Sequence, residues 1–354
     1  MGPSAAHVGR PWSRGGRDPH HVRVHRSKVG RECTSTAKAV LAILALVILA
    51  AAARAQNYPS HIIKLLHGFP PGGNVDVLAR ITAEEMSKGL GQPIVIEPKP
   101  GVVGSIAAEA VARSVPDGYT LLFVPSAHAV TAVLYNSIKY KAVDDFAWIS
   151  TVSFYPFVMV VRKDSKIGSL GDLLREAKAA PGRLSYGSTG VGSIHHMTTE
   201  LLATATGTKY LNVPYRGEGQ VITGLLGGDI NFAVTTVTVA APYIQSGDLR
   251  ALGVTSKTRW KDLPDVPTFD EAGSPGYEVI SWSGYAAAAG TPRPIVDRLN
   301  AEVRRTLKVP SVKTRIETLG GDAQPTSPEE MRALVARQVA LWARLAKEAN
   351  IERQ

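Results

Sequence analysis

Short apolar runs alternate along the chain with segments in which apolar residues recur at helical spacing. The run at residues 62–66 is rich in β-branched side chains, which is typical of a buried strand, and Leu78, Ile81 and Met86 then follow a helical period. Ser327 with Glu330 three residues later predicts a capping box at the start of the last helix. Further strands are expected at residues 93–97, 120–124, 157–161, 184–186, 211–214, 230–234, 249–254, 277–280 and 283–288, and further helices at residues 102–114, 170–180, 193–206, 219–226, 240–246, 294–308 and 327–350. This alternation predicts an α/β architecture with mostly parallel strands.

The first strand and helix are joined by Phe69-Pro70-Pro71-Gly72-Gly73-Asn74-Val75-Asp76, which we call the first glycine loop. Its glycines let backbone N–H groups approach a ligand, and the helix that follows presents unpaired amides and the positive end of its dipole. The pattern therefore indicates an anion site, although a tight strand-to-helix connection explains it equally well. Neither a phosphate-binding Gly-Lys-Ser/Thr ending nor the dinucleotide spacing G-x-G-x-x-G is present.

A second glycine loop, residues 186–196, repeats this plan about 120 residues later, in the other half of the chain. Three glycines alternate with hydroxyl residues, and a helix is expected to begin at Ser193, which also suits an N-cap role. His195 and His196 fall in the first helical turn, where neighbours do not share a face, which disfavours a joint metal site. If the halves face each other, both loops can bind one small anion.

The first 55 residues are predicted to be a basic extension and a secretory signal. Residues 39–53 form an apolar run after several basic residues, and Ala53-Arg54-Ala55 fits a cleavage site that leaves Gln56 as the new N-terminus. An uncleaved membrane anchor is the alternative. The single cysteine, Cys33, precedes the apolar run, so the mature chain is expected to contain no disulfide and no thiolate metal site.

Removing this segment changes the charge balance. The whole chain carries a net +10, but residues 56–354 hold 31 basic and 28 acidic residues, a net +3. The charge of the mature chain therefore gives no reason to expect a nucleic-acid partner. Its 299 residues are enough for two domains of about 150 residues each.

Catalytic motifs are weak in this sequence. Neither a Gly-x-Ser-x-Gly elbow nor a His-Glu-x-x-His helix is present. His128 and His196 are the best candidate bases, and the sequence offers neither of them a clear orienting carboxylate. We therefore expect no enzyme activity, cofactor or metal; a hydrolase-like enzyme or a ligand-sensing signalling subunit on the same scaffold remain the alternatives.

An ordered set of short motifs carries a family resemblance. The set covers residues 57–350 and resembles the periplasmic substrate-binding proteins of tripartite tricarboxylate transporters, often called the Bug family. The motifs, in order, are Tyr58-Pro59-Ser60, Phe69-Pro70-Pro71-Gly72-Gly73 with Asp76, Leu90-Gly91-Gln92-Pro93, Pro116-Asp117-Gly118-Tyr119-Thr120, Tyr186-Gly187-Ser188 with His196, Val213-Pro214-Tyr215-Arg216-Gly217, Leu225-Leu226-Gly227-Gly228, Leu263-Pro264-Asp265-Val266-Pro267-Thr268 and Ala289-Gly290-Thr291-Pro292.

The resemblance implies a two-lobed type II periplasmic binding protein fold, with a mostly parallel sheet flanked by helices in each lobe and two crossover segments. Residues 56–156 and 281–354 would form the first lobe, and residues 157–280 the second. It implies a periplasmic protein, expected to be a monomer, that captures a small carboxylate by lobe closure and delivers it to two integral membrane subunits.

The resemblance also implies a set of ligand-binding positions. These are Phe69, Pro71, Gly72, Gly73, Val75, Asp76 and Ser126 in the first lobe, and Ser188, Gly190, Gly192, Ser193, His196, Thr235 and Thr236 in the second. Three of them depart from the family pattern. Val75 stands where Thr is usual, and Thr235-Thr236 stands where an acidic residue often faces the ligand. The missing carboxylate argues against an amino acid and favours a plain organic acid or a dicarboxylate. His195, where the family often has a smaller or amide side chain, is expected to add a donor at the cleft edge or to face solvent.

Overall fold

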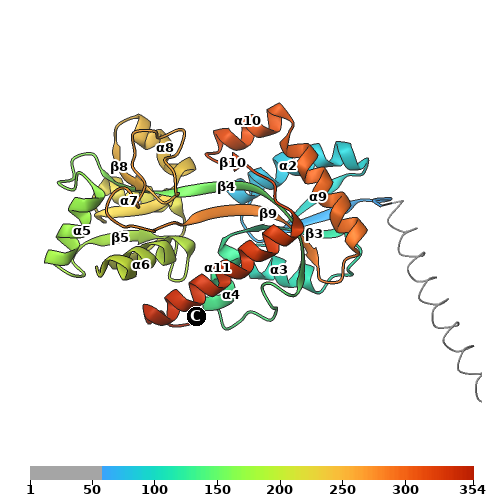
Figure 1. Cartoon of the computed structure of the whole chain (residues 1–354), viewed down its shortest axis with the longest axis horizontal. Helices are drawn as coiled ribbons and strands as arrows, with labels where there is room; N and C mark the ends of the chain where they lie inside the picture. The colour runs from blue at the N-terminus through green and yellow to red at the C-terminus, as the bar shows by residue number, and fades with distance from the viewer. Residues whose placement is uncertain (1–57) are drawn as a thin grey trace, which may run out of the picture. The chain divides into compact units, whose positions relative to one another are not determined.

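The computed structural model describes residues 58–354, which form an α/β fold with a mixed sheet (Figure 1). The strands are β1 (Ile63–His67), β2 (Ile94–Pro98), β3 (Thr120–Pro125), β4 (Phe146–Arg162), β5 (Ser185–Ser188), β6 (Leu211–Pro214), β7 (Phe232–Thr236), β8 (Leu249–Val254), β9 (Ile280–Ala288) and β10 (Asp322–Ala323). The helices are α2 (Asn74–Leu90), the 3₁₀ turn η1 (Val102–Gly104), α3 (Ser105–Ala112), α4 (Ala127–Leu134), α5 (Leu170–Ala179), α6 (Ile194–Thr206), α7 (Glu218–Gly227), α8 (Val237–Gln245), α9 (Arg293–Leu307), α10 (Pro310–Thr318) and α11 (Pro328–Glu348).

The long strand β4 takes part in two sets of strands. Hydrogen bonding connects the strands in the order β2-β1-β3-β9-β4-β7-β5-β6. The first part of β4, up to Pro156, pairs with β9, and its second part, from Phe157, pairs with β7 and β8. In Figure 1, β4 in green and β9 in orange lie between the two sets of helices.

Each set contains three neighbouring parallel strands. β2, β1 and β3 are parallel in the first set, and β6, β5 and β7 are parallel in the second. The carboxyl ends of parallel strands lie at one edge of a sheet, which is where open α/β sheets bind ligands. The first glycine loop follows β1, and the second glycine loop follows β5, so each loop lies at such an edge.

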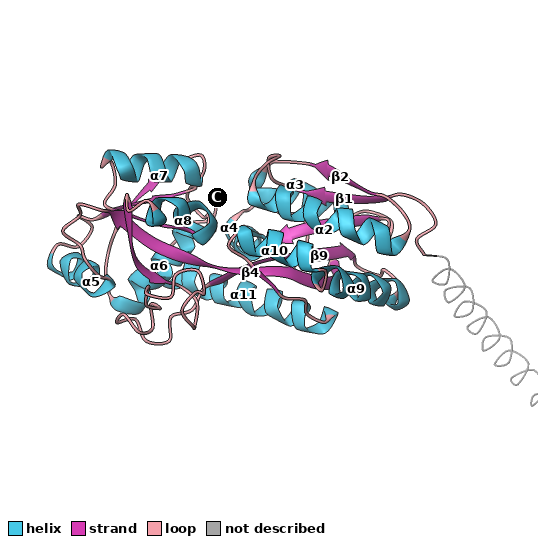
Figure 2. Cartoon of the chain, turned by 90° about the horizontal axis from the view of Figure 1, so that it is seen from above, coloured by secondary structure: helices cyan, strands magenta, loops and turns pink. Residues whose placement is uncertain are grey.

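Alternate residues of these strands enter different hydrophobic cores, because successive side chains of a strand point to opposite faces. Phe157 and Met159 of β4 pack in one core with α5, α6 and the end of α11, whereas Val158 and Val160 pack in another with α7 and α8. The same alternation divides β3 between a core with α2, α9 and α10 and a core with α3 and α11. Figure 2 shows helices along β4, with α11 running beside it.

Most of the expected strands and helices are present. The expected strand at 283–288 belongs to β9, which begins at Ile280, so the strand expected at 277–280 is wrong except for its last residue; the expected strand at 157–161 is the end of β4. The helices α4 and α10 and the strand β10 were not expected from the sequence. The capping box is confirmed, since Ser327 and Glu330 exchange the two expected hydrogen bonds.

The predicted signal segment, residues 1–55, lies outside the described residues. Within residues 58–354, every helix is too short or too polar to cross a membrane. The assignment of residues to two lobes stays a prediction. The end of α11 does not fit this assignment simply: Trp342, which the prediction places in the first lobe, packs in the core of the second set of strands.

Candidate functional site

The first glycine loop is held in shape by its own helix. The amide of Gly72 donates to Oδ2 of Asp76, four residues later, at 2.9 Å. Gly72 has a φ of +81°, a left-handed conformation that side chains with a Cβ rarely adopt. The bond directs the Asp76 carboxylate, in the first turn of α2, back toward the loop. The loop therefore has this conformation without a bound ligand.

Asp76 also binds two other side chains. It is 2 % exposed, receives two hydrogen bonds from Arg80, and lies 3.0 Å from Nε2 of His67. Because the amide of Phe69 donates to Nδ1 of His67, the neutral ring donates its Nε2 proton to Asp76. The hydrogen bond from Arg80 is the main cause that lowers the pKa of Asp76 to about 2, against the opposing effect of burial. The Asp76 carboxylate therefore stabilises the conformation of the loop through these hydrogen bonds.

The N-terminus of α2 remains open to a ligand. Its N-cap residue, Gly73, has no side chain to cap it, and the carbonyl of Gly73 accepts the amide of Val77 at 3.0 Å. In the described part of the chain, no side chain caps this first turn, and its amides carry the positive end of the helix dipole. This is the arrangement that favours a bound anion.

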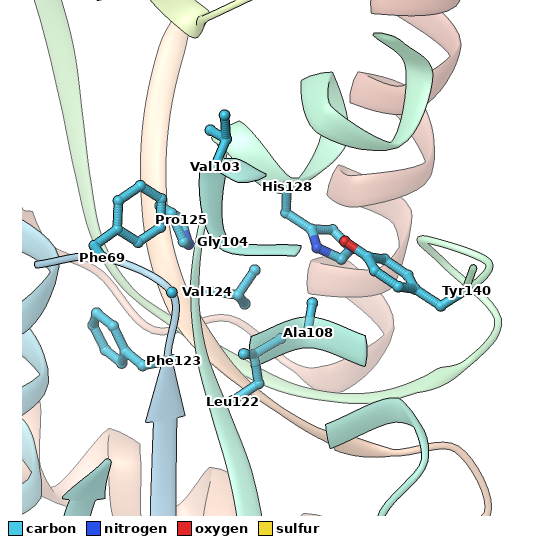
Figure 3. A pocket seen from close by; sticks show the side chains of 11 residues that line it. Phe69, Val103, Gly104, Ala108, Leu122, Phe123, Val124, Pro125, His128 and Tyr140 are labelled. Carbon is cyan, nitrogen blue, oxygen red and sulfur yellow. The ribbon is translucent and has the colours of Figure 1, made fainter. Parts of the chain in front are cut away.

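The side of the first glycine loop packs against the turn after β2. A Cβ atom placed on Gly68 would lie 2.1 Å from Cα of Gly104, so the two backbones meet without room for a side chain. The ring of Phe69 packs against Gly104 and borders a cavity of about 10 Å³ (Figure 3). A cavity of that size holds one water molecule and is too small for a carboxylic acid.

His128 lies on the far side of this cavity, facing Tyr140 in Figure 3. Its Nε2 is 2.9 Å from the carbonyl oxygen of Ala142, and its ring packs among Tyr140, Phe146 and Trp148. Burial lowers the pKa of His128 to about 4. The ring is therefore neutral and structural at neutral pH, which weakens its candidacy as a catalytic base.

Ser126, the first-lobe hydroxyl expected at the site, lies at the end of β3 and is 1 % exposed. Its amide donates to the carbonyl of Trp282, and its hydroxyl is 2.7 Å from the hydroxyl of Ser281 on β9. These bonds connect the end of β3 to a crossover strand. Ser126 thus has partners inside the protein at the position where the resemblance expected it to contact a ligand.

The second glycine loop repeats the bracing of the first. The amide of Gly192 donates to Nδ1 of His196, again four residues later, at 3.0 Å. Ser193 caps α6 by accepting the amide of His196, which confirms its N-cap role. Burial lowers the pKa of His196 to about 4, so at neutral pH its ring is uncharged and Nδ1 is free to accept this bond.

The turn of the second glycine loop is packed differently at its two later glycines. Gly190 has a φ of +115° and no neighbour that a Cβ atom would meet. The hydroxyl of buried Ser188 and the amide of Gly190 are 3.3 Å apart. Gly192 approaches Leu134 of α4, whose Cδ1 would lie 3.1 Å from an added Cβ. The loop is thus open at Gly190 and packed against α4 at Gly192.

Thr235 and Thr236 end β7, and both donate to a carboxylate that the sequence analysis did not single out. Oε2 of Glu218, the first residue of α7, accepts the hydroxyls of both threonines and the amide of Thr236, the last two at 2.8 Å. The inference that this place lacks a carboxylate was therefore wrong. The acidic group comes from a neighbouring element, because β6 and β7 both end at this edge of the sheet.

His195 completes this cluster. Its Nδ1 is 2.9 Å from the hydroxyl of Thr189, and its Nε2 is 3.4 Å from Oε1 of Glu218. Burial would raise the pKa of Glu218, but the neighbouring His195 ring and the hydrogen bonds from the two threonines together lower it to about 2. Glu218 is therefore ionised at neutral pH. His195 is 7 % exposed, so it does not face solvent.

Val75 is 9 % exposed and packs in the core with Leu78 and Ala79, so its side chain does not replace a hydroxyl at the surface. Pro71 is exposed at the tip of the first glycine loop. Within residues 58–354, no group of three or more metal-ligating side chains is close enough to hold a metal ion. The ligand-binding roles of all these positions stay predictions.

Comparison with known proteins identifies the chain. Residues 78–351 match the model of the tripartite tricarboxylate transporter family receptor, TctC. The chain belongs to this family. The matched segment contains the whole second glycine loop and Glu218 and begins two residues after the first glycine loop.

Solved structures of TctC-type proteins share this fold. Rpa4515 of R. palustris with adipate is 34 % identical, with a TM-score of 0.74 over 83 % of this chain and 99 % of the other. The periplasmic binding protein BugD is 33 % identical, with a TM-score of 0.73 over 84 % of this chain and 100 % of the other. MatC from Rhodopseudomonas palustris with bound malate is 30 % identical, with a TM-score of 0.72 over 81 % and 99 %. The family and the fold expected from the sequence are confirmed.

Proposed function

We propose that this TctC-family protein captures a small carboxylate between its two glycine loops and delivers it to two integral membrane subunits of a tripartite tricarboxylate-type transporter. The observation that supports this most strongly is the shared construction of the loops. In each loop, a side chain in the first helical turn accepts the amide of a glycine four residues before it, Asp76 from Gly72 and His196 from Gly192.

The chemistry of the loops suits a carboxylate. The amides at the start of α2 lack a side-chain cap, and Gly190 presents its backbone without a side chain in the way. Charge-assisted hydrogen bonds from such donors contribute about 1.5–3 kcal/mol each. Because neither loop contains Lys or Arg, backbone dipoles and hydroxyls would supply the attraction.

The ligands of related proteins point the same way. Rpa4515 was solved with adipate and MatC with malate, and both ligands are dicarboxylates. We extend the carboxylate class to this chain, without naming its ligand. In this proposal the lobes comprise residues 56–156 with 281–354 and residues 157–280, and they close as a monomer around the ligand, without catalysis.

The place of action follows from the family. A protein of this kind acts in the periplasm, and we propose that the segment up to Ala55 is a signal removed before Gln56. N-terminal sequencing of the protein from the periplasmic fraction tests this. Recovery of the protein only in the membrane fraction, with residues 39–53 retained, would instead support the anchored form.

A thermal-shift screen of purified mature protein against C3 to C6 mono-, di- and tricarboxylates tests the function. A ligand at about 100 times its dissociation constant stabilises the folded state by about 2.7 kcal/mol. We expect at least one acid to raise the melting temperature, and its amide, which lacks the negative charge, to have no effect. If no acid shifts the melting temperature and the protein hydrolyses an ester or amide, the transport function is wrong.

A further inference from the structure

Glu218 lies at the edge of the sheet where the second glycine loop begins. It is the first residue of α7, directly after the turn that follows β6, and it reaches the end of β7. The side chain is 21 % exposed, so the carboxylate is enclosed without being sealed from the site. Glu218 thus places a fixed negative charge beside the loop that is proposed to hold the ligand.

The two oxygens of this carboxylate differ in what they bind. Oε2 accepts three hydrogen bonds from Thr235 and Thr236. Oε1 lies 3.4 Å from Nε2 of His195, and among residues 58–354 this contact does not have hydrogen-bonding geometry. A carboxylate has about four acceptor positions, and those on Oε1 are left for another donor.

His195 supplies an independent sign of an incomplete site. Its side chain is more than nine-tenths buried, and in the described part of the chain its Nε2 has no hydrogen-bond partner. Buried polar atoms in proteins nearly always have a partner, and exceptions mark places where a ligand, ion or water completes the bonding. The atom without a partner lies next to the oxygen with free acceptor positions, so both belong to one site.

We infer that Glu218 is the specificity-determining residue of this binding site, and that it selects a carboxylate ligand that also carries a hydroxyl or ammonium donor. The donor of the ligand binds Oε1 of Glu218 while its carboxylate binds the loop amides. A ligand with only carboxylates has no donor for Oε1 and is repelled by its charge. This inference rests on the proposed function, and it replaces the preference for plain acids that the sequence suggested.

Glu218 also has a structural role that the test must separate. Through Oε2 it holds the junction between β7 and α8 by accepting the amide of Thr236. Glu218→Gln keeps one oxygen for these three donors and replaces the other oxygen by an NH₂ group. The variant therefore keeps the hydrogen bonds to the two threonines and replaces the acceptor Oε1 by a donor, which should reverse the preference for donor-bearing ligands.

The experiment is calorimetry of the wild-type protein and Glu218→Gln with matched ligand sets: succinate, malate and aspartate, and propionate, lactate and alanine. We expect the wild-type protein to bind a hydroxyl- or amino-substituted member at least about tenfold more tightly than the unsubstituted acid of the same set, as one charge-assisted hydrogen bond provides. In Glu218→Gln this ratio should fall to about one or below, with the unsubstituted acid bound at least as tightly as by the wild type. Comparing the hydroxyl with the amino member then identifies the donor.

Glu302→Gln is the matched control, because Glu302 is a 1 % exposed glutamate on α9, paired with Arg298 and Arg305. It should lower the melting temperature and leave the ligand ratio unchanged. An unchanged ratio in Glu218→Gln, or an equal loss of affinity for all ligands, would overturn the inference and leave the carboxylate function standing. Absence of binding to every acid by the wild type would overturn the carboxylate function itself.

Discussion

The amide of Gly192 donates to Nδ1 of His196 at 3.0 Å, and this bond reproduces in the second glycine loop what Gly72 and Asp76 form in the first. A neutral ring and an ionised carboxylate thus perform the same task at the same spacing of four residues. Each side chain accepts the amide of a glycine in its own loop. Loop shape is therefore set by the protein and not by the ligand.

Acid should weaken the protein through His196. Burial lowers its pKa in the folded state to about 4, below the ordinary value of 6.5, so the unfolded chain takes up the proton first as pH falls. The free energy of unfolding should drop by about 2 kcal/mol between pH 7 and pH 5 from this group alone. His196→Asn, whose side-chain oxygen can still accept the Gly192 amide, should lose this dependence. Urea melts at both pH values measure it, and an unchanged pH dependence in the variant would contradict the assignment.

Asp76 should contribute stability that is lost only in stronger acid. Its pKa in the folded state is lowered to about 2, chiefly by Arg80, so its contribution is complete above the ordinary value near 4 and disappears as pH falls to about 2. Asp76→Asn should cost about 2 kcal/mol at pH 7 and much less at pH 2, and it should weaken ligand binding.

Asp172→Asn is the control for Asp76, since Asp172, in the first turn of α5, accepts the amide of Gly168 in the exposed loop before that helix. It removes the same kind of brace away from the glycine loops, so ligand affinity should not change. Equal losses of affinity in both variants would show that Asp76 has no special role in the first glycine loop. Calorimetry with the acid found in the screen gives the comparison.

Gly68→Ala should disturb the first glycine loop. The added methyl group would lie 2.1 Å from Cα of Gly104, so one of the two backbones must move, which costs about 1–3 kcal/mol. Gly171→Ala in α5 places a methyl group at an ordinary 3.7 Å from Ser169 and should be neutral or slightly stabilising. Thermal melts and ligand titrations of both variants test this. If Gly68→Ala changed neither the melting temperature nor the ligand affinity, the backbone of the loop would be able to move away from Gly104 at little cost.

Trp342 should connect the last helix to the second glycine loop. It is 1 % exposed and packs in the core that also contains Tyr186 and Met197, on the elements before and after that loop. Trp342→Ala should cost about 3–5 kcal/mol, as large cavities do. Trp342→Phe should cost much less, because within residues 58–354 the indole Nε1 has no hydrogen-bond partner to lose. Similar unfolding free energies for the two variants would show that cavity volume is not the cause.

Local patterns explain how much of the fold could be read from the sequence. Residues within a few positions of each other determine the two glycine loops, the capping box at Ser327 and most strands and helices. These features can therefore be predicted without tertiary information. The helices α4 and α10 and the strand β10 were missed because short segments carry little periodicity. The length of β4 was missed because its pairing with β9 and then β7 depends on distant strands.

The sequence by itself determined the family, the class of fold and the location of both glycine loops, because ordered motifs and glycine positions are properties of the chain. Only the tertiary structure decided what each side chain in the site binds. Glu218 meets Thr235 and Thr236 because β6 and β7 end at the same edge, although 17 residues separate the first pair in sequence. A carboxylate that the local sequence lacks at Thr235 is thereby supplied through space, and only a folded sheet can bring it there.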